Sequence, residues 1–228
     1  MAQETSKTDL FTRELRDTLI RETRGSHTIK IAKHESVYTC GERGDAVYFI
    51  EGGQVKLVMV STEGREGIIA VHGAGELFGE LSLSGFSERI ETTTAMEGTS
   101  LRVIPASKFF GLLESHSLIE GFVGYLSARI AHQQEVITDL ATSGSEQRLG
   151  TTLLELAREL GNKEGNGLTL EHKMSHEELS EMVGTTRARV SVFMQRFRAL
   201  GLIETRAQRC LLVRDKDLSD YLTQLASC

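Results

Sequence analysis

The sequence predicts an α+β protein with an N-terminal jelly-roll or double-stranded β-helix domain, a long dimerisation helix and a C-terminal winged helix-turn-helix domain. Three observations support this prediction. Short β-rich runs separated by glycine turns fill residues 27–104, a continuous helical repeat occupies residues 117–142, and an arginine-rich helical half follows. Short strands with turn glycines are typical of small barrels and jelly rolls, whereas a heptad repeat is typical of helices that pair.

Length and composition indicate a soluble chain with two domains. The 228 residues are 39% hydrophobic and 25% charged, and they contain no apolar run of the roughly 18 residues that a membrane span needs. We therefore expect no membrane partner, no signal peptide and a cytoplasmic location. The three cysteines lie far apart without metal-binding spacing, so we expect neither a disulfide framework nor a metal site. A redox-sensing Cys40 is an open alternative.

The N-terminal half should begin with a tail and a short helix. Residues 1–9 are polar and are expected to be disordered, and residues 10–22 place apolar side chains at helical spacing. Residues 10–116 together should form an effector-sensing β-roll with short flanking helices. Pro105, the only proline of the chain, precedes the second of these helices.

The long helix carries a heptad seam. Over residues 117–142 one stripe of side chains recurs at alternating steps of four and three, and Ser117 is the expected N-terminal cap. Such a stripe is where two helices meet, so we expect a homodimer; a core helix packed within one subunit is the alternative. The predicted seam consists of Ile119, Val123, Leu126, Ile130, Gln133, Ile137 and Leu140.

A break of small residues separates the two halves. Residues 143–145 form the predicted hinge, and residues 146–228 the predicted winged helix-turn-helix domain. Within it, residues 161–167 are expected to be a loop. The helix-turn-helix should span about 175–200, with a capping box at its start, a tight turn at Gly184 and a β-hairpin wing after it.

Charge is distributed unevenly along the chain. The formal net charge is −6, yet residues 185–214 contain seven arginines and a single acidic residue, Glu204. A focused basic patch on a helix-turn-helix attracts DNA phosphates, so double-stranded DNA is the expected partner.

The second helix of this motif is the predicted recognition helix. Its expected inner face is Val190, Phe193, Phe197 and Leu200. Arginine binds guanine bidentately in the major groove, whereas hydroxyls and other cations mostly bind phosphates. The predicted base-contacting residues are Arg187, Arg189, Ser191 and Gln195. The predicted phosphate-contacting residues are Ser175, His176, Thr185, Thr186, Arg198, Arg206 and Arg209. A plain three-helix domain with solvated arginines is the alternative.

A second constellation lies at residues 75–89 of the β-roll. A glycine-rich turn with exposed amides precedes Arg89, a combination that can hold a phosphate, and a nearby carboxylate can accept a ribose hydroxyl. A glycine-rich barrel corner with a structural arginine is the open alternative.

Both constellations, and their order, resemble the CRP/FNR family of bacterial transcription regulators over about residues 10–215. FGELSL…SER at 78–89 is similar to the family's phosphate-binding cassette, and SHEELSEMVGTTRARVSVFMQRFRALGLIE at 175–204 is similar to its helix-turn-helix. The resemblance implies a homodimeric bacterial regulator that binds a palindromic DNA site and works with RNA polymerase. No nucleophile–base pattern or P-loop indicates an enzyme.

The resemblance also implies roles within the cassette. The cAMP sensors of the family use a glycine and a glutamate at positions matching Gly79 and Glu80. The glutamate holds the ribose hydroxyl, and an arginine matching Arg89 pairs with the cyclic phosphate. This chain departs from their pattern at Ile90 and Glu91, and a carboxylate there would repel a phosphate. The implied effector pocket consists of Gly79, Glu80, Leu81, Arg89, Ile90, Glu91, Gln133 and Gln134.

The departures leave the effector open. They disfavour cAMP, and no cofactor is assigned, although a cyclic nucleotide or another small anion stays an alternative. A ligand-independent regulator of the same family is the second alternative, and a cyclic-nucleotide-binding module that acts on a protein partner is the third. On the recognition helix, the family's Arg, Glu and later Arg are matched by Arg187, Ala188 and Val192, so the preferred DNA site should differ from the family's best-known one.

Overall fold

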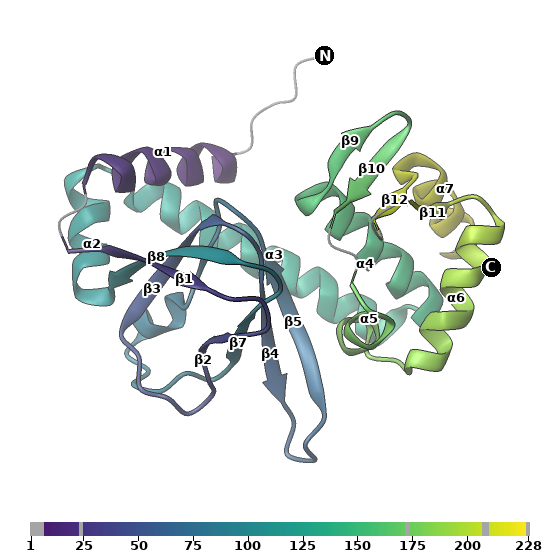
Figure 1. Ribbon diagram of the computed structural model, residues 1–228, viewed down its shortest axis with the longest axis horizontal. Coiled ribbons are helices and arrows are strands. Elements are labelled where there is room, and N and C mark those ends of the chain that lie inside the picture. The colour runs from purple at the N-terminus through teal and green to yellow at the C-terminus, as the bar shows by residue number, and fades with distance from the viewer. Residues whose placement is uncertain (1–6, 23–24, 172–173, 207–209, 227–228) are drawn as a thin grey trace. The chain divides into compact units, whose positions relative to one another are not determined.

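The computed structural model describes residues 7–22, 25–171, 174–206 and 210–226 of the chain. The chain forms two compact units, Met1–Gln134 and Glu135–Cys228, whose helices and strands are labelled in Figure 1. Within the described residues, no helix is both long enough and apolar enough to span a membrane.

The first unit contains two four-stranded antiparallel sheets, which confirms the predicted jelly roll. The first sheet has the order β1 (His27–Ile31), β8 (Thr99–Pro105), β3 (Ala46–Gly52) and β6 (Leu77–Phe78). The second sheet has the order β2 (Ser36–Tyr38), β7 (Thr92–Ala95), β4 (Val55–Val60) and β5 (Glu66–His72). A short 3₁₀ helix, η1 (Glu80–Ser84), interrupts the strands after β6.

Strand β3 shows how this unit divides its core. Successive side chains of a strand point to opposite faces of the sheet. Val47 and Phe49 accordingly pack with the helices, whereas Tyr48 and Ile50 pack between the two sheets.

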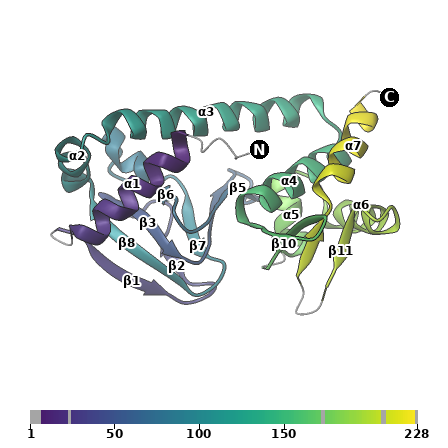
Figure 2. The ribbon, with the colours of Figure 1, turned by 90° about the horizontal axis from the view of Figure 1, so that it is seen from above.

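Three helices cover the first sheet, and Figures 1 and 2 both show them on its outer side. They are α1 (Lys7–Arg21), α2 (Ala106–Ser115) and the first part of α3 (Ile119–Thr142). The predicted tail at 1–9 is too long, because α1 already begins at Lys7. No proline or glycine precedes residue 10 to end a helix there, and residues 1–6 lie outside the described part of the chain.

The start of α3 also differs from the prediction. Ser117 does not cap the helix: it has a φ of 57°, in the left-handed region. The helix starts one residue later, where the carbonyl of Leu118 accepts the first hydrogen bond, from the Phe122 N–H at 2.9 Å. Leu118 is buried and its own N–H donates to Leu113 of α2, so a tight α2–α3 corner outweighs the local capping preference of serine.

The second unit is a helix-turn-helix with a wing, as predicted. Its helices are α4 (Ser145–Leu160), α5 (His176–Val183), α6 (Arg187–Ala199) and α7 (Asp215–Ala226). Its antiparallel sheet has the order β11 (Ile203–Thr205), β12 (Leu211–Val213), β10 (Gly167–Leu170) and β9 (Asn162–Glu164).

Residues 161–167 are not the loop that the sequence predicts. Strands β9 and β10 form a hairpin there, with Glu164 opposite Gly167. The turn residue Gly165 has a φ of 60°, which a two-residue hairpin turn requires. Strands this short carry too few alternating residues to be recognised from the sequence.

The predicted hinge coincides with a break in the helices. Helix α3 ends at Thr142 and α4 begins at Ser145. The two compact units nevertheless divide earlier, inside α3, because its last two turns pack against the second unit.

Candidate nucleic-acid interface and effector cassette

The first helix of the motif, α5, begins with the predicted capping box. The Ser175 hydroxyl accepts a hydrogen bond from the Glu178 N–H at 3.1 Å, and the Glu178 carboxylate accepts one from the Ser175 N–H at 2.9 Å. The helix ends at Gly184, whose φ of 65° and ψ of 49° are left-handed. A side chain at this position would strain the turn, so glycine sets the angle at which the next helix leaves.

The recognition helix α6 is anchored by three buried residues. Val190, Met194 and Phe197 are each fully buried, and the Thr186 hydroxyl caps the helix by accepting from the Arg189 N–H at 3.3 Å. The predicted inner face is therefore wrong in part. Phe193 is only half-buried, and Leu200 is 54% exposed because it lies beyond the helix end and outside the buried stripe.

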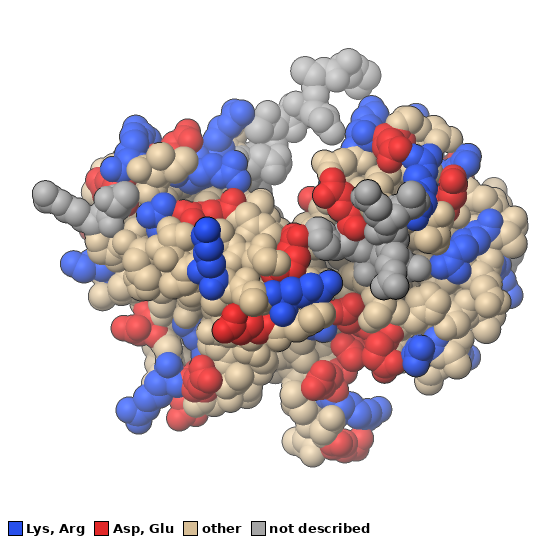
Figure 3. All heavy atoms as spheres, viewed as in Figure 1, with Lys and Arg blue, Asp and Glu red and all other residues tan. Residues whose placement is uncertain are grey.

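The opposite side of α6 is accessible. Arg187, Arg189 and Gln195 are exposed, as base contacts require. Ser191 is half-buried and lies 2.8 Å from Nδ1 of His176, so these two predicted contacts also join α5 to α6. In Figure 3, Lys and Arg side chains gather over α6, whereas acidic side chains lie over α5.

Acidic neighbours already engage several of the arginines. Arg187 lies 4.0 Å from Glu177, in a pair in which both side chains are largely exposed. Arg206 pairs with Glu164 and lies 3.9 Å from Glu204. Arg198 donates weakly to Thr205, at 3.4 Å. These exposed pairs contribute little to stability and exchange readily for phosphates.

The remaining predicted phosphate contacts differ in their placement. Thr185 is half-buried and Thr186 is exposed, at the turn between the two helices. Arg209, also predicted to contact phosphates, lies outside the described residues.

Two arginines that the sequence reasoning did not assign hold the motif together. Arg196 binds Glu146 of α4 at 2.6 Å, and the Tyr221 hydroxyl donates to the same carboxylate at 2.7 Å. The hydrogen bond and charge of Glu146 raise the pKa of Arg196. Arg196 therefore belongs to the scaffold although it lies in the basic stretch.

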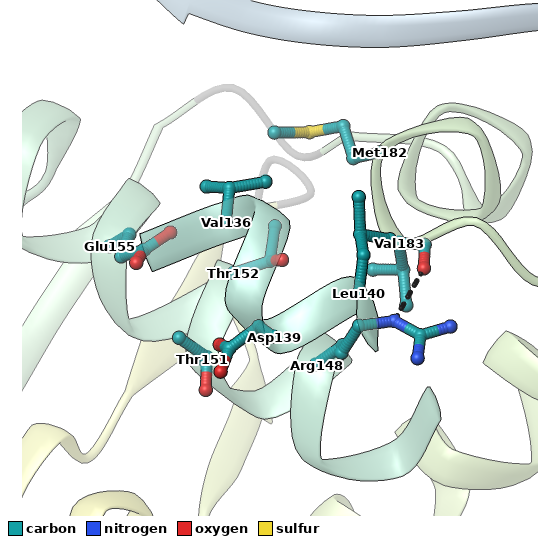
Figure 4. A pocket seen from close by; sticks show the side chains of 9 residues that line it. All are labelled: Val136, Asp139, Leu140, Arg148, Thr151, Thr152, Glu155, Met182 and Val183. Atoms are coloured by element: carbon teal, nitrogen blue, oxygen red, sulfur yellow. Dashed lines mark hydrogen bonds between the residues drawn. The ribbon is translucent and has the colours of Figure 1, made fainter. Parts of the chain in front are cut away.

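Arg148 of α4 is the second of these arginines. Its guanidinium donates to the carbonyls of Val183 at 2.9 Å, Ser143 at 2.6 Å and Gly184 at 3.3 Å. It thereby connects the break after α3 to the turn before α6. Figure 4 shows it beside a shallow hollow between the end of α3, α4 and α5.

The cassette brings together Arg89 and Gly79, two of the residues predicted for an effector pocket. Arg89 is only 5% exposed, and it donates to the carbonyls of Gly79 at 3.0 Å and Ala46 at 2.7 Å. Its guanidinium lies 4.3 Å from the ring centre of Tyr38. A Cβ at Gly44 would come within 2.5 Å of Arg89 Nε, so glycine is needed beside this side chain.

Glu91 lies inside the β-roll. It is 3% exposed and accepts a hydrogen bond from the Tyr38 hydroxyl at 2.8 Å. Burial and the neighbouring carboxylate of Glu91 both raise the pKa of Tyr38. The carboxylate therefore stands next to the tyrosine on which Arg89 packs, whereas Leu81 and Ile90 are exposed.

Glu80 belongs to a polar network that sequence reasoning missed. Its Oε1 pairs with Arg129 of α3 at 3.0 Å, and Arg129 lies 3.2 Å from Nε2 of His72. His72 Nδ1 in turn lies 3.0 Å from Glu76. Because arginine only donates, His72 Nε2 is the acceptor and its Nδ1 proton points to Glu76.

The pKa values of Arg129, Glu76 and Tyr125 are shifted in this network. Burial lowers the pKa of Arg129, but the contributions of Glu80, Tyr125 and Glu76 together outweigh burial, so the net pKa is raised. Burial raises the pKa of Glu76. The contacts with His72, the Gly73 N–H and Arg129 together lower it by more than burial raises it, so the net pKa falls below 4.5. Burial raises the pKa of Tyr125, which packs on Arg129, to about 12.

Protein groups already surround Arg89 in the cassette. Each terminal nitrogen of Arg89 donates one hydrogen bond to a backbone carbonyl, and Glu91 is buried beside the tyrosine on which Arg89 packs, so a phosphate bound to Arg89 would lie near a second negative charge. Among the described residues, Glu80 Oε2 and Arg89 Nε are buried without a hydrogen-bond partner. Gln133 and Gln134 lie exposed on α3, beyond Arg129.

The predicted seam of α3 is largely exposed. Phe122 and Tyr125 are buried on the side of the helix that faces the β-roll, and Leu126 packs against the same core. The other apolar members are between 48% and 64% exposed: Ile119, Val123, Ile130, Ile137 and Leu140.

Two family models match the chain. A cyclic nucleotide-binding domain matches residues 28–116, and a Crp-like helix-turn-helix domain matches residues 147–218. The cyclic AMP receptor protein of Thermus thermophilus is 30% identical over 156 residues, which cover 68% of this chain and 69% of the relative. The CRP-like cAMP-activated global transcriptional regulator of Mycobacterium tuberculosis is 26% identical over 187 residues, 81% of this chain and 83% of the relative.

A solved structure shows the same architecture. A CRP/FNR-family transcriptional regulator of Thermus thermophilus superposes with a TM-score of 0.67 at 26% identity, over 86% of this chain and 98% of its own. The proteins that this chain resembles are regulators of transcription, not enzymes.

Proposed function

The chain belongs to the CRP/FNR family of transcription regulators, and we propose that it acts as a homodimer that reads an inverted DNA repeat through α6. The exposed basic face of α6 carries this proposal. Val190, Met194 and Phe197 fix the helix on the scaffold, which leaves Arg187 and Arg189 accessible at its N-terminal end. Residues at the start of a recognition helix reach base edges in the major groove.

The exposed stripe on α3 supports the dimer. A soluble monomer rarely exposes a continuous apolar stripe, because water contact with it is unfavourable. Ile130 and Ile137, at 56% and 64% exposure, are spaced as heptad positions that pack against a second copy. A two-fold axis along this seam would relate two recognition helices, and the DNA site would share that symmetry.

The closed cassette supports regulation without a cyclic nucleotide. Arg89 already donates to Gly79 and Ala46, and the Glu91 carboxylate is buried beside Tyr38, on which Arg89 packs, so protein groups hold the arginine and a negative charge lies near it. We propose that the nucleotide-free dimer binds DNA in the cytoplasm and contacts RNA polymerase there. A small anionic effector is the second candidate, favoured by the unpartnered Nε of Arg89. A nucleotide-binding module acting on a protein partner is the third.

Selection from a randomised duplex pool tests the proposal. The purified protein should enrich one inverted repeat, and its affinity should fall with salt by a slope of about −0.9 per neutralised phosphate. Arg187→Ala should cost about 1–3 kcal/mol at one base position of each half-site. Arg158→Ala removes the same charge from an exposed position of α4 outside the motif and is the matched control. Unchanged site preference in Arg187→Ala would refute the base contact.

A further inference from the structure

Val192 occupies an unusual position on α6. It is 55% exposed, and within this fully described helix it is the one large hydrophobic side chain that is exposed. It adds nothing to the buried face of Val190, Met194 and Phe197. A β-branched residue at an exposed helical position also lowers helix propensity, so the fold gives no reason for a valine here.

Helix geometry places Val192 at the centre of the outward face. Each residue turns the helix by about 100°, so Val192 lies almost opposite both Val190 and Met194, two residues to either side. Ala188, one turn before Val192, is exposed on the same ridge. Ala188 and Val192 therefore form a short apolar ridge.

Polar and charged residues border the ridge on both sides. Arg187 and Ser191 follow one edge, and Arg189 follows the other. If the flanking cations fix α6 in a groove, the ridge between them faces the bases. Such a position cannot use hydrogen bonds, because neither side chain has a polar atom.

One apolar group is available on base edges in the major groove, the C5 methyl of thymine. We propose that Val192, assisted by Ala188, reads a thymine methyl in each half-site, so that it sets sequence preference beside the arginines. The inference rests on the proposed function, because it needs α6 in the major groove. The positive charge around the ridge fits DNA rather than an apolar protein partner.

Deoxyuridine provides a direct test, because it removes this methyl and leaves base pairing intact. In the selected site, each symmetric pair of thymines is replaced in turn by deoxyuridine. Loss of one buried methyl weakens binding by about fourfold, so a pair should weaken wild-type binding by roughly 15-fold at one position. Val192→Ala should bind the thymine site more weakly and show little response to deoxyuridine at that position.

Two controls make the outcome decisive. Val60→Ala truncates an equally exposed valine, 56% exposed in β4, and should keep the full deoxyuridine response. If Val192→Ala responds to deoxyuridine like wild type at every position, or if wild type responds at none, the inference is overturned while DNA binding stands. If wild type shows no salt-dependent DNA binding at all, the proposed function is refuted, and this inference is refuted as well because it depends on that function.

Discussion

The guanidinium of Arg148 donates to the carbonyl of Val183 at 2.9 Å, although the two residues are 35 positions apart in the chain. The same side chain reaches the carbonyls of Ser143 and Gly184. Arg148 therefore satisfies backbone groups at the end of α3 and at the turn of the DNA-binding motif together. We infer that it sets the geometry of the turn from which α6 departs.

Replacement of Arg148 should weaken both folding and specific DNA binding. Arg148→Ala leaves the carbonyls of Ser143 and Val183 without their donor, which should cost about 1–3 kcal/mol of unfolding free energy. Arg148→Lys should recover only part of this loss, because an ammonium lacks the fork of parallel donors. Urea denaturation and DNA titration measure the two effects. Full stability in Arg148→Ala would contradict the assignment, with Arg158→Ala as the control.

A charge placed in the seam of α3 should weaken the proposed dimer. Ile130→Glu places carboxylates opposite each other in the proposed interface, where like charges cost several kcal/mol, so the dimer dissociation constant should rise about 100-fold or more. Ala128→Glu adds the same charge at an exposed position on the other side of the helix and should leave the dimer intact. Sedimentation equilibrium distinguishes the two. Equal effects of both variants would place the interface elsewhere.

The lowered pKa of Glu76 predicts how the stability of the protein depends on pH. Its folded-state pKa lies below 4.5, so its ionised form stabilises the protein above that pH, and the contribution is lost as pH falls through the folded-state value. Glu76→Gln should therefore be less stable than wild type by about 1–3 kcal/mol at neutral pH, and the difference should shrink in acid.

Denaturation from about pH 7 to about pH 3 measures this difference. Glu63→Gln, at a largely exposed ion pair, should follow wild type throughout. A constant gap between wild type and Glu76→Gln across the range would contradict the role of the His72 and Arg129 contacts.

Replacement of Glu91 should allow the cassette to bind cAMP more tightly. Glu91→Ala removes the carboxylate that accepts from Tyr38, the residue on which Arg89 packs. Without that repulsion, binding of cAMP should tighten by at least about tenfold, as measured by calorimetry. Arg89→Leu in the same background should abolish the gain. Equal cAMP binding with and without Glu91 would show that the carboxylate does not close the site.

Local sequence patterns predicted the parts of the fold that depend on neighbouring residues. The capping box at Ser175 and the turn at Gly184 each follow from spacing within a few residues. The heptad spacing of α3 predicts a seam, and its role in a dimer stays a prediction. The apolar spacing predicted Leu200 on the inner face of α6, but this helix ends at Ala199, so Leu200 does not share the buried face. The β9–β10 hairpin was missed because its strands are too short to show alternation.

The contacts that organise the sites could not be read from the sequence. Arg148 bonds to backbone carbonyls, which carry no residue signature. Arg129 meets Glu80 and His72 only because α3 packs against the β-roll. Such contacts depend on tertiary packing, which local patterns do not specify. Glu91 was recognised as a departure, but its hydrogen bond to Tyr38 needed the structure.

The most direct test of the central claim is DNA binding by the nucleotide-free protein. The selected duplex is titrated with purified protein, and the stoichiometry and affinity are measured with and without added cAMP or cGMP. Our account predicts one dimer on an inverted repeat with half-sites about one helical turn apart, and no change in affinity with either nucleotide. Binding that requires a nucleotide, or a monomer on an asymmetric site, would contradict it.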